Sequence, residues 1–330
     1  DVVYFSEKEK TVQPQIEALG GRVYKINPPS AKGILKHEMS RFFAAHKNEW
    51  EALHIHAPHF AVFISPQAKK AGIKKICCHC HTTWYSLFPK NEFRNRLLAA
   101  PVKCLAGTRF ACGTDAGKFW FKDNFYVLAN AVDCAAFRFD EKRREKARQS
   151  LGLGDCLVCG NVGRLYPPQK NHPFILKIFA EVKKQRSDAK LLLVGAEEEP
   201  SLLSLAKKLE IEKDVLFLGQ RRDVADLLFA MDVFLFPSLR EGLPVAAIEA
   251  QASGLPVLMA STITREALVA PNAKMLSLEA SPREWANAAA SAALEARKDN
   301  YDIMKAAGWD IKERAARLAE YYRTGVFRDF

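Results

Sequence analysis

The chain has 330 residues, of which 48% are hydrophobic, so it is long enough to bury two cores and is expected to form two domains. It holds no uninterrupted apolar run of about 18 residues, which excludes a membrane-spanning helix. The net charge of +11 is uneven: residues 1–155 carry 25 Lys and Arg against 15 Asp and Glu, and residues 156–330 carry 24 against 23.

The first half alternates short apolar runs with helical patterns. The runs that predict strands are, in chain order, 2–5, 22–26, 52–56, 75–80, 110–112 and 125–128. Helical patterns lie between most of them, as in an α/β domain. The charged segment 138–148 predicts a linker followed by an exposed helix, so the domain boundary is expected near residue 150.

The second half shows the same alternation more clearly. The predicted strands are 157–162, 191–194, 215–218, 233–236 and 257–259, and the predicted helices are 173–185, one near 202–209, one from Val224 and one from Val245. Continuously apolar strands indicate a parallel sheet covered by helices on both faces. We therefore expect two doubly wound domains, over 1–150 and 151–307, with a helix at about 308–330 that packs back on the first.

The segment 237–256 carries the densest chemical signal. It follows a predicted buried strand, makes a turn and enters a helix, at the sheet edge where such folds bind ligands. Amides around Gly242 and Leu243 are expected to point from the helix N-terminus toward a diphosphate. Glu241 in the loop and Glu249 in the helix are placed to accept hydrogen bonds from a transferred sugar and a ribose. Solvated surface glutamates are the alternative, and the strand–turn–helix context favours the functional interpretation.

A second signal follows the first strand of the second half. Gly163 and Arg164 end that strand, and Lys170 precedes a helix whose expected N-cap is Asn171. Two cations at this edge can neutralise a diphosphate that gains charge as its glycosidic bond breaks. Surface Arg and Lys are common, so the motif gains weight because it shares its sheet edge with the glutamate motif.

These two stretches resemble the donor-site motifs of glycosyltransferase family 4. The resemblance also covers segments 192–195, 217–219, 231–238 and 127–133, the last with alanines where the family has Pro and Gly. It extends over nearly the whole chain and is closest to members that build bacterial exopolysaccharide, capsule or lipopolysaccharide. It implies the GT-B fold, two Rossmann-like domains facing a central cleft. Because the chain starts at what would be the family's second strand, we expect the first domain to lack its first strand and helix.

The resemblance implies a retaining, metal-independent hexosyltransferase that needs no cofactor. Its substrates would be a UDP-sugar, or a GDP-sugar as the less favoured donor, and a glycan or lipid-linked acceptor in cell-surface polysaccharide synthesis. The implied catalytic residues are Arg164, Lys170, Glu241 and His81, with His81 reaching the donor sugar from the first domain. The implied donor-binding residues are Gly163, Gly219, Gln220, Arg221, Ser238, Gly242, Leu243, Pro244 and Glu249.

Three weaker candidates, His54, His56 and Asn130, lie on the expected acceptor side. For the two histidines, a structural role and an acceptor-site role are equally open. The Cys-rich and His-rich segment 77–82 and the pair Cys156 and Cys159 invite a zinc interpretation. Adjacent strand residues point to opposite faces, however, and the pair has no spaced partner pair, so we expect no metal site and reduced thiols.

The segment 84–98 mixes aromatic, apolar and basic residues. It fits either an amphipathic surface that lies on an anionic membrane or an ordinary packed helix with a solvated charged face. The basic first half gives the two equal weight, because lipid-linked acceptors are presented at the cytoplasmic face. We expect a cytoplasmic protein with peripheral contact to the inner face of the membrane through that half, and no nucleic-acid partner.

Two other functions stay open. A sugar-nucleotide 2-epimerase shares the two-domain architecture and would release free nucleotide without an acceptor, but the pair of glutamates counts against it. A non-catalytic basic protein that binds membrane or nucleic acid ranks last, because aromatic and basic residues interleave only locally.

Overall fold

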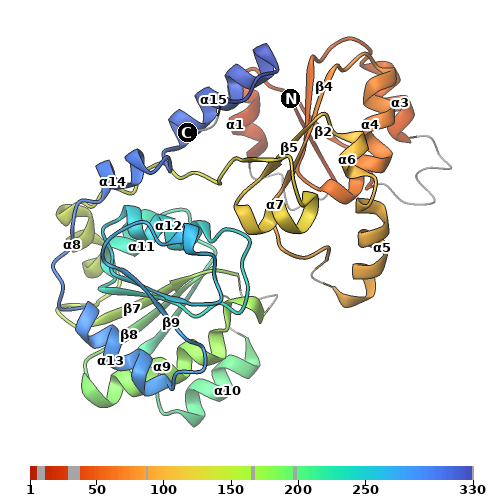
Figure 1. Cartoon of the computed structure of the whole chain (residues 1–330). Coiled ribbons are helices and arrows are strands. Elements are labelled where there is room, and N and C mark those ends of the chain that lie inside the picture. Colours follow the sequence, from red (N-terminus) through yellow and green to blue (C-terminus); the bar gives the residue numbers. More distant parts are fainter. Residues whose placement is uncertain (6–11, 29–37, 87, 165–167, 196–198, 329–330) are drawn as a thin grey trace.

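The structure, a computed structural model, describes residues 1–5, 12–28, 38–86, 88–164, 168–195 and 199–328. The chain forms two α/β domains, and its C-terminal helix returns to lie beside the first domain (Figure 1). None of the helices in the described part of the chain combines the length and apolarity needed to cross a bilayer.

The strands of the first domain are parallel and form two sheets. The first sheet pairs β1 (Val2–Tyr4) with β2 (Val23–Lys25). The second has the order β3 (Ala52–Ile55), β4 (Lys75–Cys80), β5 (Thr108–Ala111) and β6 (Tyr126–Val127). All six predicted strands are present, most of them trimmed by a residue or two, and β5 begins two residues earlier than predicted. The helices are α1 (Gln13–Ala18), α3 (Glu38–Ala45), α4 (Ala61–Lys70), α5 (Pro89–Ala99), α6 (Val102–Leu105) and α7 (Thr114–Phe121).

The second domain has one six-stranded parallel sheet in the order β12-β11-β10-β7-β8-β9. Its strands are β7 (Val158–Val162), β8 (Lys190–Val194), β9 (Val215–Gly219), β10 (Val233–Phe236), β11 (Val257–Ala260) and β12 (Ala273–Leu276). The chain runs outward from β7 to β9 and then crosses back to β10, so the strand order reverses between β7 and β10. Folds of this kind bind ligands at that reversal, outside the carboxyl ends of the strands.

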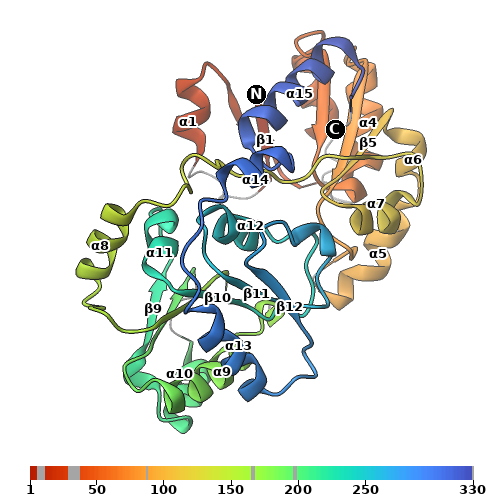
Figure 2. The same ribbon diagram turned by 60° about the vertical axis from the view of Figure 1, so that its left-hand side comes forward.

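Helices cover both faces of this sheet, as the continuously apolar strands predict (Figures 1 and 2). α9 (His172–Gln185), α10 (Pro200–Lys208) and α13 (Pro282–Ala292) lie on one face. α11 (Val224–Ala230) and α12 (Val245–Ala252) lie on the other, next to α8 (Glu141–Ser150) and α14 (Tyr301–Ala306). The expected apolar stripe of α9 is fully buried, and it consists of Ile175, Ile178, Phe179 and Val182.

The charged segment before the second domain forms the predicted helix, and most of its residues are exposed, but one side of the helix faces inward. In α8, the side chains of Arg144 and Arg148 are only 19% and 11% exposed, and both pair with Asp232, at 2.7 and 3.3 Å. Asp232 also accepts a hydrogen bond from the amide of Val158 at the start of β7 (2.8 Å). The composition did not predict this inward side, which forms because guanidinium groups can be partly buried when each is paired.

The last helix, α15 (Ile311–Thr324), packs on the sheet of the first domain. Tyr321 joins a buried cluster with Cys77 and Phe110. Lys75 at the start of β4 donates hydrogen bonds to the carbonyl oxygens of Tyr322 (2.7 Å) and Arg323 (2.6 Å) in α15. These contacts tie the end of the chain to β4.

Candidate functional site

The predicted donor residues gather where the strand order of the second domain reverses. Arg164 and Lys170 follow β7, and Glu241 follows β10, the strand that pairs with β7. The two loops are joined by a backbone hydrogen bond from the amide of Leu239 to the carbonyl oxygen of Gln169 (2.8 Å). Both predicted motifs therefore lie at one point of one sheet edge.

Lys170 and Glu241 form an ion pair across this point. Their charged atoms, Nζ and Oε1, lie 2.9 Å apart, and the side chains are 15% and 8% exposed. Gln169 Nε2 donates to the second carboxylate oxygen (3.3 Å), and Nζ of Lys170 lies 4.5 Å from the ring centre of Phe236. A cation and a carboxylate so placed can contact a phosphate oxygen and a sugar hydroxyl of one ligand.

The residues around Lys170 shape the turn. A Cβ at Gly163 would lie 3.0 Å from side-chain carbons of Lys170, so the glycine allows the lysine to approach. Arg164 is exposed next to it. Asn171 occupies the N-cap position with a left-handed φ of 58°, but its side chain does not cap the helix. The predicted N-cap position is confirmed, but the side chain acts elsewhere: Asn171 Nδ2 donates to the carbonyl oxygen of Pro237 (3.2 Å) and ties the two loops together.

The glutamate motif lies on α12 and the loop before it. Pro244 is the N-cap residue and α12 begins at Val245, as the sequence pattern predicts. Glu249 lies inside α12, where burial raises the pKa of its carboxyl to about 7. Ser238, just after β10, is fully buried, and its carbonyl oxygen accepts a hydrogen bond from Thr262 (3.0 Å).

The turn that contains the predicted donor-binding residues Gly219, Gln220 and Arg221 lies at the end of β9. Gly219 adopts a positive φ of 59°, and its carbonyl oxygen accepts a hydrogen bond from the amide of Gly195 (2.6 Å), which joins the ends of β9 and β8. Gln220 and Arg221 are exposed. The guanidinium of Arg221 makes two hydrogen bonds to Asp223, at 2.8 and 2.6 Å.

The first domain brings His81 to this edge. A Cβ at Gly242 would lie 2.0 Å from the carbonyl oxygen of His81, so the loop before α12 touches the end of β4. The ring of His81 is held by Asn130 Oδ1 at Nδ1 (3.1 Å) and by His56 Nδ1 at Nε2 (2.9 Å). Burial lowers the pKa of His81 to about 4, so its imidazole is neutral near pH 7. Nδ1 of His54 lies 2.6 Å from the hydroxyl of Tyr322 in α15.

Two further contacts join the domains, and local sequence patterns do not reveal either. Both carboxylate oxygens of Glu266 accept from the amide of Thr114 at the start of α7, each at 3.0 Å. The guanidinium of Arg240 lies 5.1 Å from the ring centre of Trp84. Gln169, the neutral partner of Glu241, was also not predicted as a site residue. The signal for it is its place beside Lys170 in the turn after β7.

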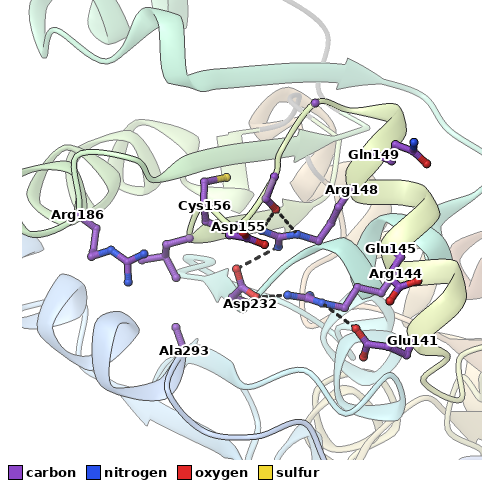
Figure 3. A pocket seen from close by; sticks show the side chains of 13 residues that line it. Glu141, Arg144, Glu145, Arg148, Gln149, Asp155, Cys156, Arg186, Asp232 and Ala293 are labelled. Atoms are coloured by element: carbon purple, nitrogen blue, oxygen red, sulfur yellow. Dashed lines mark hydrogen bonds and ion pairs between the residues drawn. The ribbon is translucent and has the colours of Figure 1, made fainter.

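A hollow of about 860 Å³ lies at the opposite end of the same sheet (Figure 3). Its charged lining includes Arg144, Arg148 and Asp232, which satisfy one another or nearby carbonyl oxygens. It lies at the amino ends of β7 and β10, away from the strand ends that carry the predicted site residues. We therefore place the candidate site at the carboxyl edge, not in this hollow.

Known proteins resemble the chain along most of its length. Residues 157–294 match the family described as Glycosyl transferases group 1. The chain is 30% identical over 342 residues, which cover 96% of it and 86% of the relative, to EpsF of Bacillus subtilis (strain 168), a protein named as a glycosyltransferase. It is 28% identical over 257 residues, 71% of this chain and 64% of the relative, to the UDP-Gal:alpha-D-GlcNAc-diphosphoundecaprenol alpha-1,3-galactosyltransferase of Escherichia coli.

Solved structures share the architecture. The crystal structure of Anabaena HepE in complex with UDP and glucose matches 98% of this chain and 91% of its own, with a TM-score of 0.80 and 20% sequence identity. The structure of WaaG, a glycosyltransferase involved in lipopolysaccharide biosynthesis, matches 98% and 94%, with a TM-score of 0.62 and 16% identity. Both likenesses show the expected GT-B fold of two Rossmann-like domains.

Proposed function

The chain belongs to the group 1 glycosyltransferases, glycosyltransferase family 4, and we propose that it transfers a hexose from a nucleoside diphosphate sugar, with retention, to a glycan or lipid-linked acceptor of cell-surface polysaccharide synthesis. The observation that carries this proposal is the Lys170–Glu241 ion pair at the strand reversal. The pair places a cation, which can contact a phosphate oxygen, beside a carboxylate, which can accept a hydrogen bond from a sugar hydroxyl.

On the donor side, Arg164 and Lys170 would hold the diphosphate. As the glycosidic bond breaks, negative charge grows on the leaving phosphate, and fixed cations stabilise that charge in the transition state. Glu241 would accept hydrogen bonds from the sugar hydroxyls once the ligand displaces its contact with Lys170. Glu249 would bind the ribose, and the turn at Gly219 would lie near the base.

On the acceptor side, His81 would contact the transferred sugar through Nε2 once a sugar hydroxyl replaces its contact with His56, while Asn130 fixes the ring at Nδ1. We propose that the leaving phosphate takes the proton of the acceptor hydroxyl on the same face of the sugar, which gives retention. Because the cations come from side chains, the reaction would proceed without added Mg²⁺ or Mn²⁺, and transfer rates with and without these ions test this.

UDP is the favoured nucleotide. The HepE structures contain UDP and UDP-glucose, and the galactosyltransferase from Escherichia coli is named for a UDP-sugar donor. A mannosyltransferase of Corynebacterium glutamicum that is 28% identical over 205 residues is named for GDP-mannose, so GDP stays in the screen.

An exposed apolar stripe on α5 supports contact with a membrane. Phe93 is 72% exposed and Leu97 is 59% exposed. They are four residues apart on one face of the helix, and basic residues stand between them in the sequence. Such a surface can insert its apolar side chains among lipids while its cations meet anionic headgroups. Sedimentation with vesicles of anionic and of neutral lipid tests this: binding to anionic vesicles should fall in the double variant Phe93→Ser, Leu97→Ser.

The test of the transfer reaction has two steps. Calorimetric titration with UDP, GDP and ADP identifies the base, and we expect one to bind selectively and Glu249→Ala to lose that binding. Incubation of the matching nucleotide sugar with lipid-linked acceptors, followed by NMR of the product, then reports the anomeric configuration. Free nucleotide and a 2-epimeric sugar formed without acceptor would instead identify an epimerase, and an inverted product would contradict retention.

A further inference from the structure

Four histidines form a patch on one face of the first domain's sheet. His54 and His56 lie in and just after β3, and His79 and His81 lie in and just after β4. Residues two apart on a strand share a face, and the register pairs Ile55 with Cys78, which puts His56 beside His79. The rings of His54 and His56 stack with centres 4.4 Å apart, and those of His79 and His81 are 4.1 Å apart.

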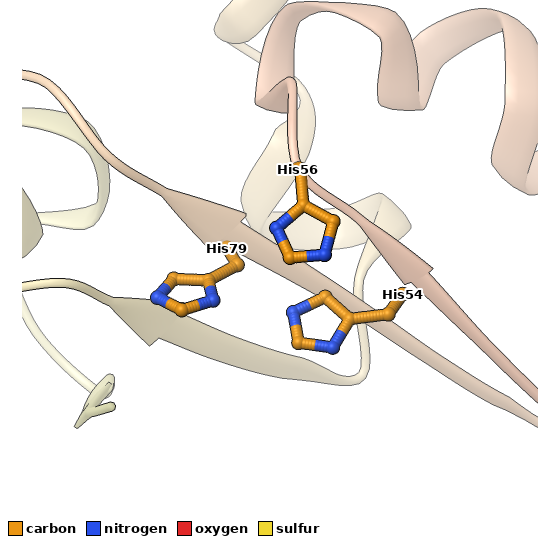
Figure 4. A group of neighbouring side chains, drawn as sticks. All are labelled: His54, His56 and His79. Atoms are coloured by element: carbon orange, nitrogen blue, oxygen red, sulfur yellow. The ribbon is translucent and has the colours of Figure 1, made fainter. Parts of the chain in front are cut away.

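Three of these rings point nitrogen atoms at one another (Figure 4). One ring nitrogen from each of His54, His56 and His79 lies within 4.8 Å of the other two. Among the described residues, Nε2 of His54 and both ring nitrogens of His79 are buried without a hydrogen-bond partner. Buried polar atoms are nearly always satisfied, and an ion is one of the partners that explains such orphans.

The hydrogen bond that His54 makes leaves one of its ring nitrogens available to an ion. A neutral imidazole offers a nitrogen lone pair without first losing a proton. In the tautomer whose Nδ1 donates to the hydroxyl of Tyr322 (2.6 Å), the orphaned Nε2 of His54 keeps its lone pair.

We propose that His54, His56 and His79 bind a single divalent transition-metal ion, with Zn²⁺ as the representative of the class. Imidazole nitrogens are ligands for this class, at about 2.0–2.1 Å from zinc. Tetrahedral ligands at that distance lie about 3.3 Å from one another, so small side-chain rotations from the observed spacing close the site. His56 is exposed and provides a path for the ion to enter.

Hydrogen bonds from neighbouring side chains hold the histidine rings of the patch in place. Tyr322 of α15 holds His54, and His81 holds His56 and is itself held by Asn130. Metal-binding histidines usually have such a partner on their second nitrogen. An ion here would tie β3 to β4 next to the proposed site residue His81, and its binding does not depend on glycosyl transfer.

The nearby thiols are poorer candidates. Cys78 belongs to the core cluster of the opposite face, and Cys77 on the histidine face donates its thiol to the carbonyl oxygen of Leu53 (3.4 Å). The proposed metal site could not be predicted from the spacing of residues in the sequence, because its ligands come from alternating positions on two strands.

The experiment measures Zn²⁺ binding to the tag-free, full chain by equilibrium dialysis near pH 7.5. We expect one equivalent to bind and to raise Tm, and His54→Gln and His79→Gln each to weaken binding by at least about 100-fold, more than the loss of an outer-shell partner costs. His172→Gln is the matched control, because His172 is also buried with an unpartnered Nε2 but stands outside the patch. It should bind as the wild type does.

Co²⁺ in place of Zn²⁺ gives a second readout, since zinc has no visible spectrum. Visible d–d bands without thiolate charge transfer are expected, lost in His54→Gln. Far-UV circular dichroism of the metal-free variants shows whether they fold; if His79→Gln does not, His54→Gln at the more open position decides. Binding that survives in a folded His54→Gln variant, thiolate charge-transfer bands, or no binding to the wild type would each overturn the proposal.

Discussion

Lys170 and Glu241 form an ion pair in a partly buried position. Substituting either residue therefore removes a charge from the site and also removes the contact that positions the other side chain. We expect Glu241→Gln and Lys170→Ala each to lower kcat by about 10²–10³, the range seen when one preorganised transition-state contact is removed. Steady-state rates with the donor identified by titration measure this. Lys184→Ala, which breaks an exposed pair with Glu181 on α9, is the control and should keep wild-type kcat. Wild-type turnover in either site variant contradicts the assignment.

Glu249 links the site to pH. Burial raises the pKa of its carboxyl from 4.5 to about 7. Between these values the folded protein holds a proton that the unfolded chain has lost, so the free energy of unfolding falls as pH rises. Glu249→Gln should remove this dependence and, near pH 8, raise the free energy of unfolding by up to about 3 kcal/mol. Urea titrations near pH 5 and pH 8 measure both effects. The exposed Glu279→Gln variant should keep the wild-type dependence, and a Glu249→Gln variant that also keeps it rules out a raised pKa.

At the scale of elements, the carboxylate of Asp232 helps to hold α8 to the sheet, together with backbone carbonyl oxygens that accept from Arg144 and Arg148. Removing Asp232 leaves Arg144, Arg148 and the amide of Val158 without that acceptor. Breaking a largely buried pair from one side costs about 3–5 kcal/mol, whereas a surface pair is worth less than about 1 kcal/mol. Asp232→Ala should therefore shift the urea midpoint of the second domain far more than Asp188→Ala, whose pair with Arg186 is about half exposed. Equal midpoints would show that α8 is held without the carboxylate of Asp232.

The elements themselves were largely predictable. Runs such as 233–236 are uninterrupted apolar segments of strand length, and only a sheet covered on both faces buries every residue of such a run. The boundaries were less certain: α9 begins one residue before its predicted start, and β5 begins two residues before its predicted start. The interior side of α8 could not be predicted, because Asp232 is distant in sequence and only the fold makes it a partner for the arginines.

The candidate site was predictable as two motifs at one sheet edge but not as a contact. Lys170 and Glu241 are 71 residues apart, and they meet because β10 returns to pair with β7. The contributions of Thr114 and Glu266 depend on how the domains face each other, which no local pattern encodes. The histidine patch was missed for a similar reason: its members are scattered over two strands whose register sets their spacing.

At the scale of the whole molecule, the two domains touch at backbone level beside the site. The loop before α12 fits against the end of β4 only because residue 242 has no side chain: a Cβ there would lie 2.0 Å from the carbonyl oxygen of His81 and 3.1 Å from Cα of Thr82. Neither contact is the mobile end of a side chain, so a larger residue must push the domains apart. The hydrogen bonds from Thr114 to Glu266 lie across the same interface and would be strained by that movement.

Gly242→Ala should therefore open the molecule while leaving each domain folded. We expect a larger radius of gyration in small-angle X-ray scattering and a transfer rate at least about tenfold lower, since displacing a positioned group by about 1 Å can cost about 10²-fold. Nucleoside diphosphate binding should persist, because its proposed contacts belong to the second domain. Gly107→Ala is the control: its added Cβ would meet its nearest neighbour, the carbonyl oxygen of Ile76, at an ordinary 3.6 Å. If the Gly242→Ala protein keeps the wild-type radius of gyration and transfer rate, the backbone near His81 can make room for the methyl group without domain movement. In that case, the close packing of the two domains at residue 242 does not determine the geometry needed for transfer.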